Sequence, residues 1–430
     1  MTGKFLSAAI LATLLVGSNA MATIARQAVL GNGPIFTTTG ATALSTTAVN
    51  GSLWYDDDYN VFYNPAYVND NKNYATVQKG FEGGWFKSEF ENFAYGVYVN
   101  RGGSGAGGTG NAGNAYGNTG LVAPGFGNTT AFVGAANALD TMRPIDLFFG
   151  GDTGLKWGAH VAWAYNRNQL VGLQPNNGSA EVTNRYWHFD LGAEVMGFEP
   201  FIGATVFSKY QNTVSTSAPA AADLNEFNAG FRYKYEGWTP YAVFKKFRES
   251  GIAAGAANQT QTRNNIVGVG IGHDTKVADG VHILKNIGVW MSSVEDDNAT
   301  VTPATLTGGQ PNADAQKNYK DYVLPINVAI EAEATSWLTL RAGASFDVIN
   351  NRKFQSTNLG NSPNPVPITN ANVSQSGNTS FRVGSTVKFG KLHVDSAFGT
   401  GGGAGAAALD GTNTGFDSQT FALLSTSYHW

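Results

Sequence analysis

The chain has 430 residues, of which 42% are hydrophobic, 12% aromatic and 13% charged, and its formal net charge is −4. A soluble domain usually has about a quarter of its residues charged, so this composition indicates that much of the surface does not face water. A large apolar fraction with little net charge excludes intrinsic disorder. The acidic balance gives no basic footprint for nucleic acid. The absence of cysteine excludes disulfide scaffolds, thiolate metal sites and cysteine nucleophiles.

The N-terminus has the parts of a secretory signal peptide in their usual order. Lys4 precedes an apolar run over 5–17, and small residues that suit a cleavage site follow at 18–22. The run is too short for a helix that spans a bilayer, which needs about 20 apolar residues. We therefore predict a signal peptide over residues 1–22.

From residue 74 to the C-terminus, apolar residues recur at every second position in segments of about ten. In 155–165, for example, Leu155, Trp157 and Trp163 share one face, and Lys156 and His160 share the other. This is the period of a β-strand. A soluble β-sandwich would show the same alternation, but its strands are usually shorter, about 5–6 residues, whereas a tilted strand needs about 9–11 residues to cross a bilayer.

Connection lengths and aromatic positions favour the membrane version of such a sheet. Short turns near 151–154, 196–199, 236–237, 334–336 and 390–391 alternate with long polar loops at 101–143, 167–184, 211–224, 249–263, 296–320, 351–378 and 399–415. Outer-membrane barrels have short turns at one end and long loops at the other. Trp and Tyr residues also gather near the segment ends, where they suit the membrane interface. The sequence predicts an all-β, transmembrane, antiparallel up-and-down barrel.

Fifteen alternating segments can be counted, whereas bacterial single-chain barrels have an even number of strands. We expect the missing strand around 60–68, with the loop 101–143 as the other place to search. The prediction is a barrel of about 16 strands over 73–430, with 14 strands as the alternative. Residues 23–72 form an N-terminal segment that is either a plug or the first strand.

The last ten residues, FALLSTSYHW, resemble the C-terminal signal of Gram-negative outer-membrane β-barrels. In that comparison Trp430 is the terminal aromatic, Tyr428 is the aromatic two before it, and Leu424 lies on the same face. The resemblance implies the outer membrane of a Gram-negative cell, with membrane lipid and lipopolysaccharide around the barrel and the outer-membrane insertion machinery as a partner. The likeness to porin-type barrels implies a homotrimer as one assembly.

A second resemblance lies in 56–66, DDDYNVFYNPA. It is similar to the D-x-x-x-x-F-x-N-P-A stretch near the N-terminus of the long-chain fatty-acid transporter family, around Asn64, Pro65 and Ala66. The resemblance implies a 14-stranded barrel that moves hydrophobic molecules and holds this stretch in a plug. Residues 31–67 would then lie inside the barrel instead of supplying the missing strand.

The faces predicted to point inward are charged, with basic and acidic residues in equal number. Because an isolated charge in an apolar medium is very costly, these groups need water or partners, and we expect a wet lumen with little ion preference. The predicted pore-lining residues are Lys156, His160, Asp190, Glu194, Arg232, Lys234, Glu331, Glu333, Arg341, Asp347, Arg382, Lys388 and Asp395.

Motifs for catalysis or cofactors are not found. Gly403-x-Gly405-x-x-Ala408 follows a predicted strand but lacks the helix and acidic residue of a dinucleotide fingerprint. The six histidines have no metal-ligand spacing. We expect no enzyme activity, cofactor or metal. The predicted function is a porin-like channel for passive diffusion of small hydrophilic solutes, and the alternatives are a transporter for hydrophobic compounds and a surface or adhesion barrel.

Overall fold

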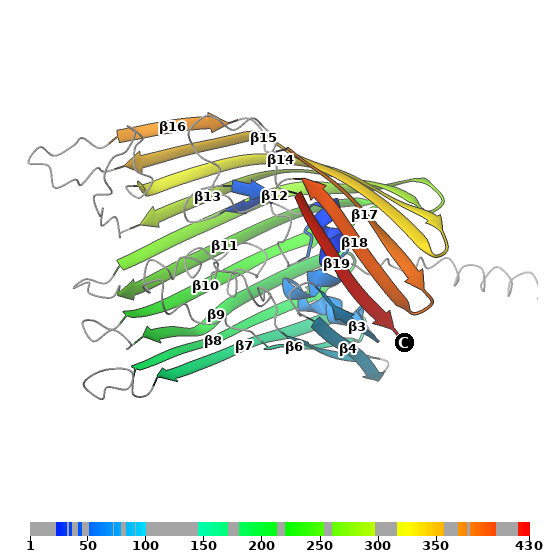
Figure 1. Ribbon diagram of the computed structural model, residues 1–430, viewed down its shortest axis with the longest axis horizontal. Helices are drawn as coiled ribbons and strands as arrows, with labels where there is room; N and C mark the ends of the chain where they lie inside the picture. The colour runs from blue at the N-terminus through cyan, green and yellow to red at the C-terminus, as the bar shows by residue number, and fades with distance from the viewer. Residues whose placement is uncertain are drawn as a thin grey trace, which may run out of the picture.

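The computed structural model describes most of the strands and part of the N-terminal segment (Figure 1). The described residues are 23–31, 34–36, 42–44, 51–71, 73–78, 83–90, 92–99, 145–170, 180–212, 220–252, 260–296, 316–356, 369–375, 379–400 and 420–430. The predicted signal peptide, the loop 101–143 and the glycines at 403 and 405 lie outside them.

A closed antiparallel β-barrel forms the body of the protein, and it begins with short strands. The first four are β3 (Tyr74–Val77), β4 (Gly83–Phe90), β5 (Phe93–Val99) and β6 (Ile145–Asp152). Nine longer strands follow: β7 (Lys156–Leu170), β8 (Ala180–Glu194), β9 (Phe198–Asn212), β10 (Ala220–Tyr233), β11 (Trp238–Ile252), β12 (Thr260–Ala278), β13 (Val281–Asp296), β14 (Gln316–Thr335) and β15 (Leu338–Ser356). The last are β16 (Thr369–Gln375), β17 (Thr379–Phe389), β18 (Leu392–Thr400) and β19 (Thr420–His429).

The barrel has sixteen strand positions, because β16 and β17 occupy one position together. Both pair with β15, β16 along residues 350–356 and β17 along 338–346. The barrel closes where β19 pairs with β3, with Thr426 opposite Val77. The predicted fold class and strand number are therefore confirmed.

The missing strand was placed wrongly. The segment that starts near residue 75 is two strands, β3 and β4, and Tyr74 of β3 pairs with Phe86 of β4. Residues 60–68 form no strand: they lie in two 3₁₀ helices, η1 (Asp58–Phe62) and η2 (Pro65–Asn69). Because β3 is four residues long, its alternation merges with that of β4, and the sequence shows one segment where there are two strands.

Tight turns fix the register of the hairpins at one end of the barrel. Met196 and Gly197 have φ angles of 50° and 79°, and Glu236 and Gly237 have 47° and 80°. Two successive positive φ angles define the type I′ turn, whose twist matches that of a β-hairpin. These turns and the C-terminus lie at the same end (Figure 1), which in outer-membrane barrels is the periplasmic end.

The two faces of the wall have opposite character. The outward face is apolar, and its exposed side chains include Trp157, Trp187, Phe231, Val269, Phe346 and Leu424. The inward face contains buried ionisable groups such as Asp190, Arg232 and Lys245. A closed sheet that is apolar outside and polar inside is the architecture of outer-membrane proteins. The protein is a β-barrel of the Gram-negative outer membrane, as predicted.

The strands β7–β15 have 14–20 residues each, longer than the ten expected and longer than the bilayer requires. Where β7–β15 form the wall, the strands therefore extend beyond the bilayer.

None of the helices among the described residues has the length and apolar character needed to cross a membrane.

The described N-terminal elements are α2 (Ile24–Leu30), β1 (Pro34–Phe36), β2 (Thr42–Leu44), η1 and η2. The strands β1 and β2 form a separate two-stranded antiparallel sheet. Helix α2 contacts β14, β15, β17, β18 and β19, while η2 contacts β5, β6, β7 and β8. Helix α2 and the 3₁₀ helices η1 and η2 lie inside the barrel, toward the end with the short turns (Figure 1). We call residues 23–31 and 51–71 the plug.

Candidate functional site

The local structure of the plug comes from side chains that cap its short helices. Thr23 accepts a hydrogen bond from the backbone N–H of Arg26 at the start of α2. Asp57 accepts one from Tyr59 at the start of η1, and Asn64 accepts one from Ala66 at the start of η2. Asp and Asn are favoured at such caps because they satisfy otherwise unpaired N–H groups, and Pro65 suits the first helical position. The stretch 56–66 therefore contains the caps that start both 3₁₀ helices, η1 and η2.

Glycines of the wall let the plug backbone approach the strands closely. A Cβ on Gly158 of β7 would lie 2.1 Å from the carbonyl oxygen of Pro65, and a Cβ on Gly343 of β15 would lie 2.0 Å from that of Val29. On Gly192 of β8, it would lie 1.9 Å from Asn64 Oδ1. A side chain at Gly158 or Gly343 would collide with the plug backbone, and one at Gly192 would displace the Asn64 side chain. The wall and the plug are therefore shaped to each other on both sides of the lumen.

An aromatic cluster joins the plug to β5, β6 and β7. The Phe62 ring lies edge-on to those of Tyr98 and Phe148, with centroids 5.1 and 5.4 Å apart. The hydroxyl groups of Tyr59 and Tyr98 lie 2.7 Å apart and are hydrogen-bonded. All four residues are buried, and edge-to-face aromatic pairs of this kind contribute about 0.5–1.5 kcal/mol beyond the area they bury.

Arg232 of β10 is the centre of the first polar cluster between wall and plug. Its Nη1 donates to the backbone carbonyls of Ser52 (2.9 Å) and Tyr55 (2.8 Å), and its Nη2 donates to Asp56 and to the Tyr67 hydroxyl. Its Nε forms an ion pair with Glu199 of β9, with an N–O distance of 2.7 Å.

Lys234, also on β10, bridges the same two acidic residues. Its Nζ lies 2.7 Å from Glu199 Oε1 and 3.0 Å from Asp56 Oδ1. The Tyr67 hydroxyl donates to Glu199 at 2.8 Å. The cluster thus has two bases and two acids, and its buried groups have charged partners. This arrangement ties residues 52–67 of the plug to β9 and β10.

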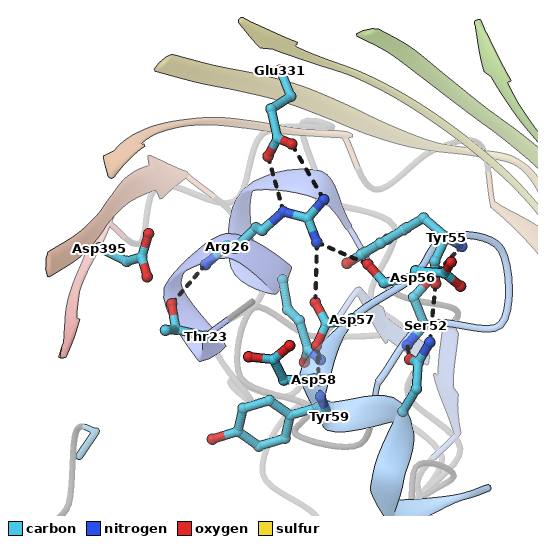
Figure 2. A network of polar contacts seen from close by, with 12 residues as sticks. Thr23, Arg26, Ser52, Tyr55, Asp56, Asp57, Asp58, Tyr59, Glu331 and Asp395 are labelled. Carbon is cyan, nitrogen blue, oxygen red and sulfur yellow. Dashed lines mark hydrogen bonds and ion pairs between the residues drawn. The ribbon is translucent and has the colours of Figure 1, made fainter. Parts of the chain in front are cut away.

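A second cluster holds α2 against β14 (Figure 2). The Arg26 guanidinium lies 2.9 Å from Glu331 Oε2 and 3.7 Å from Asp57 Oδ2, and it donates to the carbonyl oxygen of Asp56 at 2.9 Å. On the wall side, Glu331 also pairs with Arg341. Burial lowers the pKa of Arg26, but Glu331 and Asp57 outweigh that effect and raise it above its ordinary value. Arg26 therefore stays positively charged, and its ion pairs hold α2 against β14.

A third contact lies near the rim with the short turns. Lys156 Nζ lies 2.8 Å from Asp70 of the plug and 3.1 Å from Glu194 of β8. All three side chains are between one fifth and one third exposed, and ion pairs at such positions contribute about 0–1 kcal/mol. This contact positions the end of η2 but adds little stability.

The carboxyl group of Asp57 in the plug ionises less readily than that of an ordinary aspartate. Burial raises its pKa to about 6, against the opposing effects of Arg26 and of the N–H of Tyr59. Its Oδ1 accepts from Gln27 Nε2 at 2.5 Å, while Oδ2 has no hydrogen-bond partner. A proton on Oδ2 would remove a buried negative charge that is incompletely satisfied.

We expect the plug to be held more tightly as the pH falls from 7 to 4. The pKa of Asp57 is about 6 in place and about 3.9 when the plug is released, so between these values the seated form binds more protons. In Asp57→Asn the tighter holding at low pH should be lost. Proteolysis of the plug in detergent-solubilised protein at each pH is the measurement, and equal slopes in the two proteins would contradict the assignment.

A buried network of histidines and aspartates extends across the inward face of β6–β9. His160 Nδ1 lies 2.7 Å from Asp190, and its Nε2 lies 2.9 Å from Asp146. His188 Nε2 lies 3.0 Å from Asp190 and its Nδ1 lies 3.1 Å from the Thr205 hydroxyl. Both ring nitrogens of His160 face carboxylates, so the imidazole bridges Asp146 and Asp190. The network joins residues of β6, β7, β8 and β9.

The structure places all thirteen predicted pore-lining residues on the inward face, but in separate groups. Four pair directly with the plug: Lys156, Arg232, Lys234 and Glu331. Three more pair with wall residues of these clusters: Glu194 with Lys156, Arg341 with Glu331, and Asp395 with Arg341. His160 and Asp190 belong to the histidine network, and Lys388 pairs with Glu333 at 3.5 Å. Asp347 and Arg382 are buried on β15 and β17. Whether they line an open pore stays a prediction. The predicted insertion residues Leu424, Tyr428 and Trp430 face outward.

Sequence reasoning missed the partners of these residues. Asp146 follows the alternation of β6, in which Ile145 and Leu147 face outward, so the period could have found it. Glu199 was assigned to a turn, although it is the second residue of β9. Glu226 and Lys245, which form a fully buried ion pair at 2.5 Å, also obey the alternation. The plug residues have no such periodic signal.

No protein-family model matches the chain, and no curated protein sequence matches it. Among solved structures, similarity is found to the toluene transporter TodX of Pseudomonas putida, at 8% identity over 93% of this chain and 99% of that one (TM-score 0.34). A loop-deletion mutant of OmpT from Vibrio cholerae gives 10% identity over 83% and 98% (TM-score 0.33).

The hemophore receptor HasR of Serratia marcescens gives 10% identity over 60% of this chain and 43% of that one, with a TM-score of 0.36. The chain therefore spans less than half the length of that receptor. At such identities and TM-scores, neither a function nor a ligand transfers to this protein.

Proposed function

We propose that the protein is a porin-like outer-membrane channel for small hydrophilic solutes and that the plug closes its periplasmic end. The observation that supports this proposal best is the chemistry of the inward face. Arginine, lysine, histidine and carboxylate groups recur from β6 to β18, and ionised groups require water or partners. A wall of this kind passes polar solutes and rejects apolar ones.

The plug determines when such a channel conducts. It meets the wall at β5–β8 through η2, at β9 and β10 through the Arg232 cluster, and at β14, β15 and β17–β19 through α2. Polar contacts make up much of this interface, and water can replace them one at a time. We infer that opening requires the plug to shift or leave, while the barrel stays closed on itself.

Planar-bilayer recording tests the proposal. The mature protein should show small or rare conductance steps, and a variant without residues 23–72 should show larger and steadier ones. Liposomes that contain the variant should also swell in isotonic solutions of small sugars. Folding of both proteins is checked by their heat-modifiable migration on gels. A folded plug-free barrel without conductance steps would contradict the channel.

The alternative, transport of hydrophobic compounds, is favoured by the position of 56–66 inside the barrel, which the resemblance to the long-chain fatty-acid transporter family implies. It predicts uptake of a labelled fatty acid or hydrocarbon with little ion current from either protein. Lipopolysaccharide contact, the insertion machinery and a homotrimer stay predictions. So does the adhesion role, because the loops that would carry it lie largely outside the described residues.

A further inference from the structure

The outward face of β7–β14 changes character toward the end opposite the short turns. On β7, for example, Trp163 and Tyr165 face outward, and Arg167 is the next residue on that face. The exposed acidic side chains described at this level are Asp223 and Glu295. Basic side chains outnumber them, so this part of the surface is positively charged. We call the exposed outward bases here the basic band: Arg167, Arg185, Lys209, Lys246, Arg248, Arg263 and Lys320.

The position of the basic band along the strands places it at the outer surface of the membrane. Trp157 and Trp238 are exposed on the outward face next to the short turns, where tryptophan suits the membrane interface. Arg167 comes ten positions after Trp157, and Arg248 comes ten positions after Trp238. A tilted strand crosses the bilayer in about 9–11 residues. The band therefore lies at the level of the lipid headgroups of the outer leaflet.

Two pairs of like charges lie directly opposite each other in the band. Arg185 of β8 is in register with Lys209 of β9, and Arg248 of β11 is in register with Arg263 of β12. Opposite side chains have their Cβ atoms about 4.5–5.5 Å apart, and like charges at such positions destabilise a sheet. Arg263 also lies 3.7 Å from Glu295, which offsets part of the repulsion in one pair. A negative group between the two bases of each pair would replace repulsion by attraction.

An apolar groove lies on the same strands, between the basic band and the short turns. Its volume is about 680 Å³. On β11 the groove residue Phe244 is followed on the outward face by Lys246 of the band, so the groove and the band are continuous. A ligand with a charged head and an apolar tail can therefore contact both. The outward residues of the groove include Leu191, Ile202, Ala229, Phe231, Phe244 and Val269.

We propose that the basic band and the groove bind a phosphorylated lipid of the outer leaflet, with its phosphate groups on the two like-charge pairs and an acyl chain in the groove. Arginine and lysine hold phosphate through charge-assisted hydrogen bonds. The two pairs are three strand spacings apart, or about 14 Å, so two phosphates of one lipid at that separation would satisfy both. The site lies outside the barrel, and lipid binding is measured whether or not the protein conducts. It gives the expected contact with lipopolysaccharide a defined place on the wall.

Native mass spectrometry of the detergent-solubilised protein with lipid A provides the first test. Lipid A with two phosphates should bind more tightly than its dephosphorylated form. The double variant Arg248→Gln with Arg263→Gln should lose about 10- to 100-fold in affinity for the phosphorylated form, because it lacks both bases of one pair. The matched control, Lys276→Gln with Lys285→Gln, removes two exposed bases near the short turns and should bind as the wild type does. Equal binding of the two lipids, or equal affinities in the two double variants, would overturn the proposal.

The second test measures thermal unfolding in a non-ionic detergent. Without lipid, Arg248→Gln should have a higher midpoint than the wild type, because it removes the like charge opposite Arg263. With lipid A present, the order of the two midpoints should reverse. An order that stays the same would contradict the site.

Two rival occupants of the surface have distinct signatures. If inorganic phosphate raises the wild-type midpoint as much as lipid A does, the pairs bind free phosphate, and the lipid assignment fails. If the wild type forms an oligomer without lipid and the double variant is monomeric on sizing in detergent, a second copy of the chain covers this surface, and the assignment fails as well. We expect neither result. Heat-modifiable migration on gels checks that each variant has folded.

Discussion

Replacing Arg232 by methionine is expected to release the plug from the barrel wall. The change leaves Glu199 buried with one base, Lys234, and removes the donors to Ser52, Tyr55, Asp56 and Tyr67. Removal of one member of a buried ion pair typically costs about 3–5 kcal/mol. Because the barrel has its own closed hydrogen-bond ladder, we expect local release of the plug and not global unfolding. The rate of limited proteolysis of the plug in detergent should rise about 10²- to 10³-fold.

Lys234→Met is the matched control, because Lys234 pairs with the same two carboxylates but is 30% exposed. Its loss should cost about 1 kcal/mol or less, as for other solvent-accessible pairs. The double variant Arg232→Met with Glu199→Gln should recover part of the loss, because it no longer leaves a buried carboxylate short of partners. Equal protease sensitivity in Arg232→Met and the wild type would show that the cluster does not hold the plug.

The period of two in the sequence predicts the wall of this barrel well. Apolar faces such as Leu155, Trp157 and Trp163 point outward, since a closed sheet in lipid leaves no other place for them. The same rule places Arg232 and Asp190 inside. The strand count of 16 was reached although one strand was sought in the wrong place. With four residues, β3 is too short to show an alternation separate from that of β4.

The period of two does not predict the structure of the plug. Its short helices depend on single caps such as Asp57 and Asn64, which leave no periodic signal in the sequence. Its anchors join residues far apart in the chain, as in the bond between Arg26 and Glu331, which are 305 positions apart. Equal numbers of inward bases and acids suggested an unselective lumen. The structure shows that most of them pair with one another or with the plug, as Arg341 pairs with Glu331 and Asp395.

The glycines of the wall lead to a second large expected effect. Alternation places Gly158 on the inward face of β7 between Lys156 and His160, but only the folded chain shows that Pro65 and Ala66 fill the space beside it. In Gly158→Val, the new Cβ would lie 2.1 Å from the Pro65 carbonyl oxygen and 2.4 Å from the Ala66 nitrogen. These are backbone atoms, which cannot rotate away as a side chain can, so η2 has to move as a unit.

We expect Gly158→Val to form a normal barrel in which η2 is displaced, because valine suits a strand and the β7 ladder does not depend on the side chain. Single-channel conductance should rise toward that of the protein without residues 23–72, and the plug should become open to protease. Ala159→Val is the control: Ala159 is the next residue on β7 and faces away from the lumen, so the same change there should leave both readings at the wild-type level. If the conductance of Gly158→Val matches that of this control, η2 does not obstruct the lumen. That result would contradict the proposal that this part of the plug closes the channel.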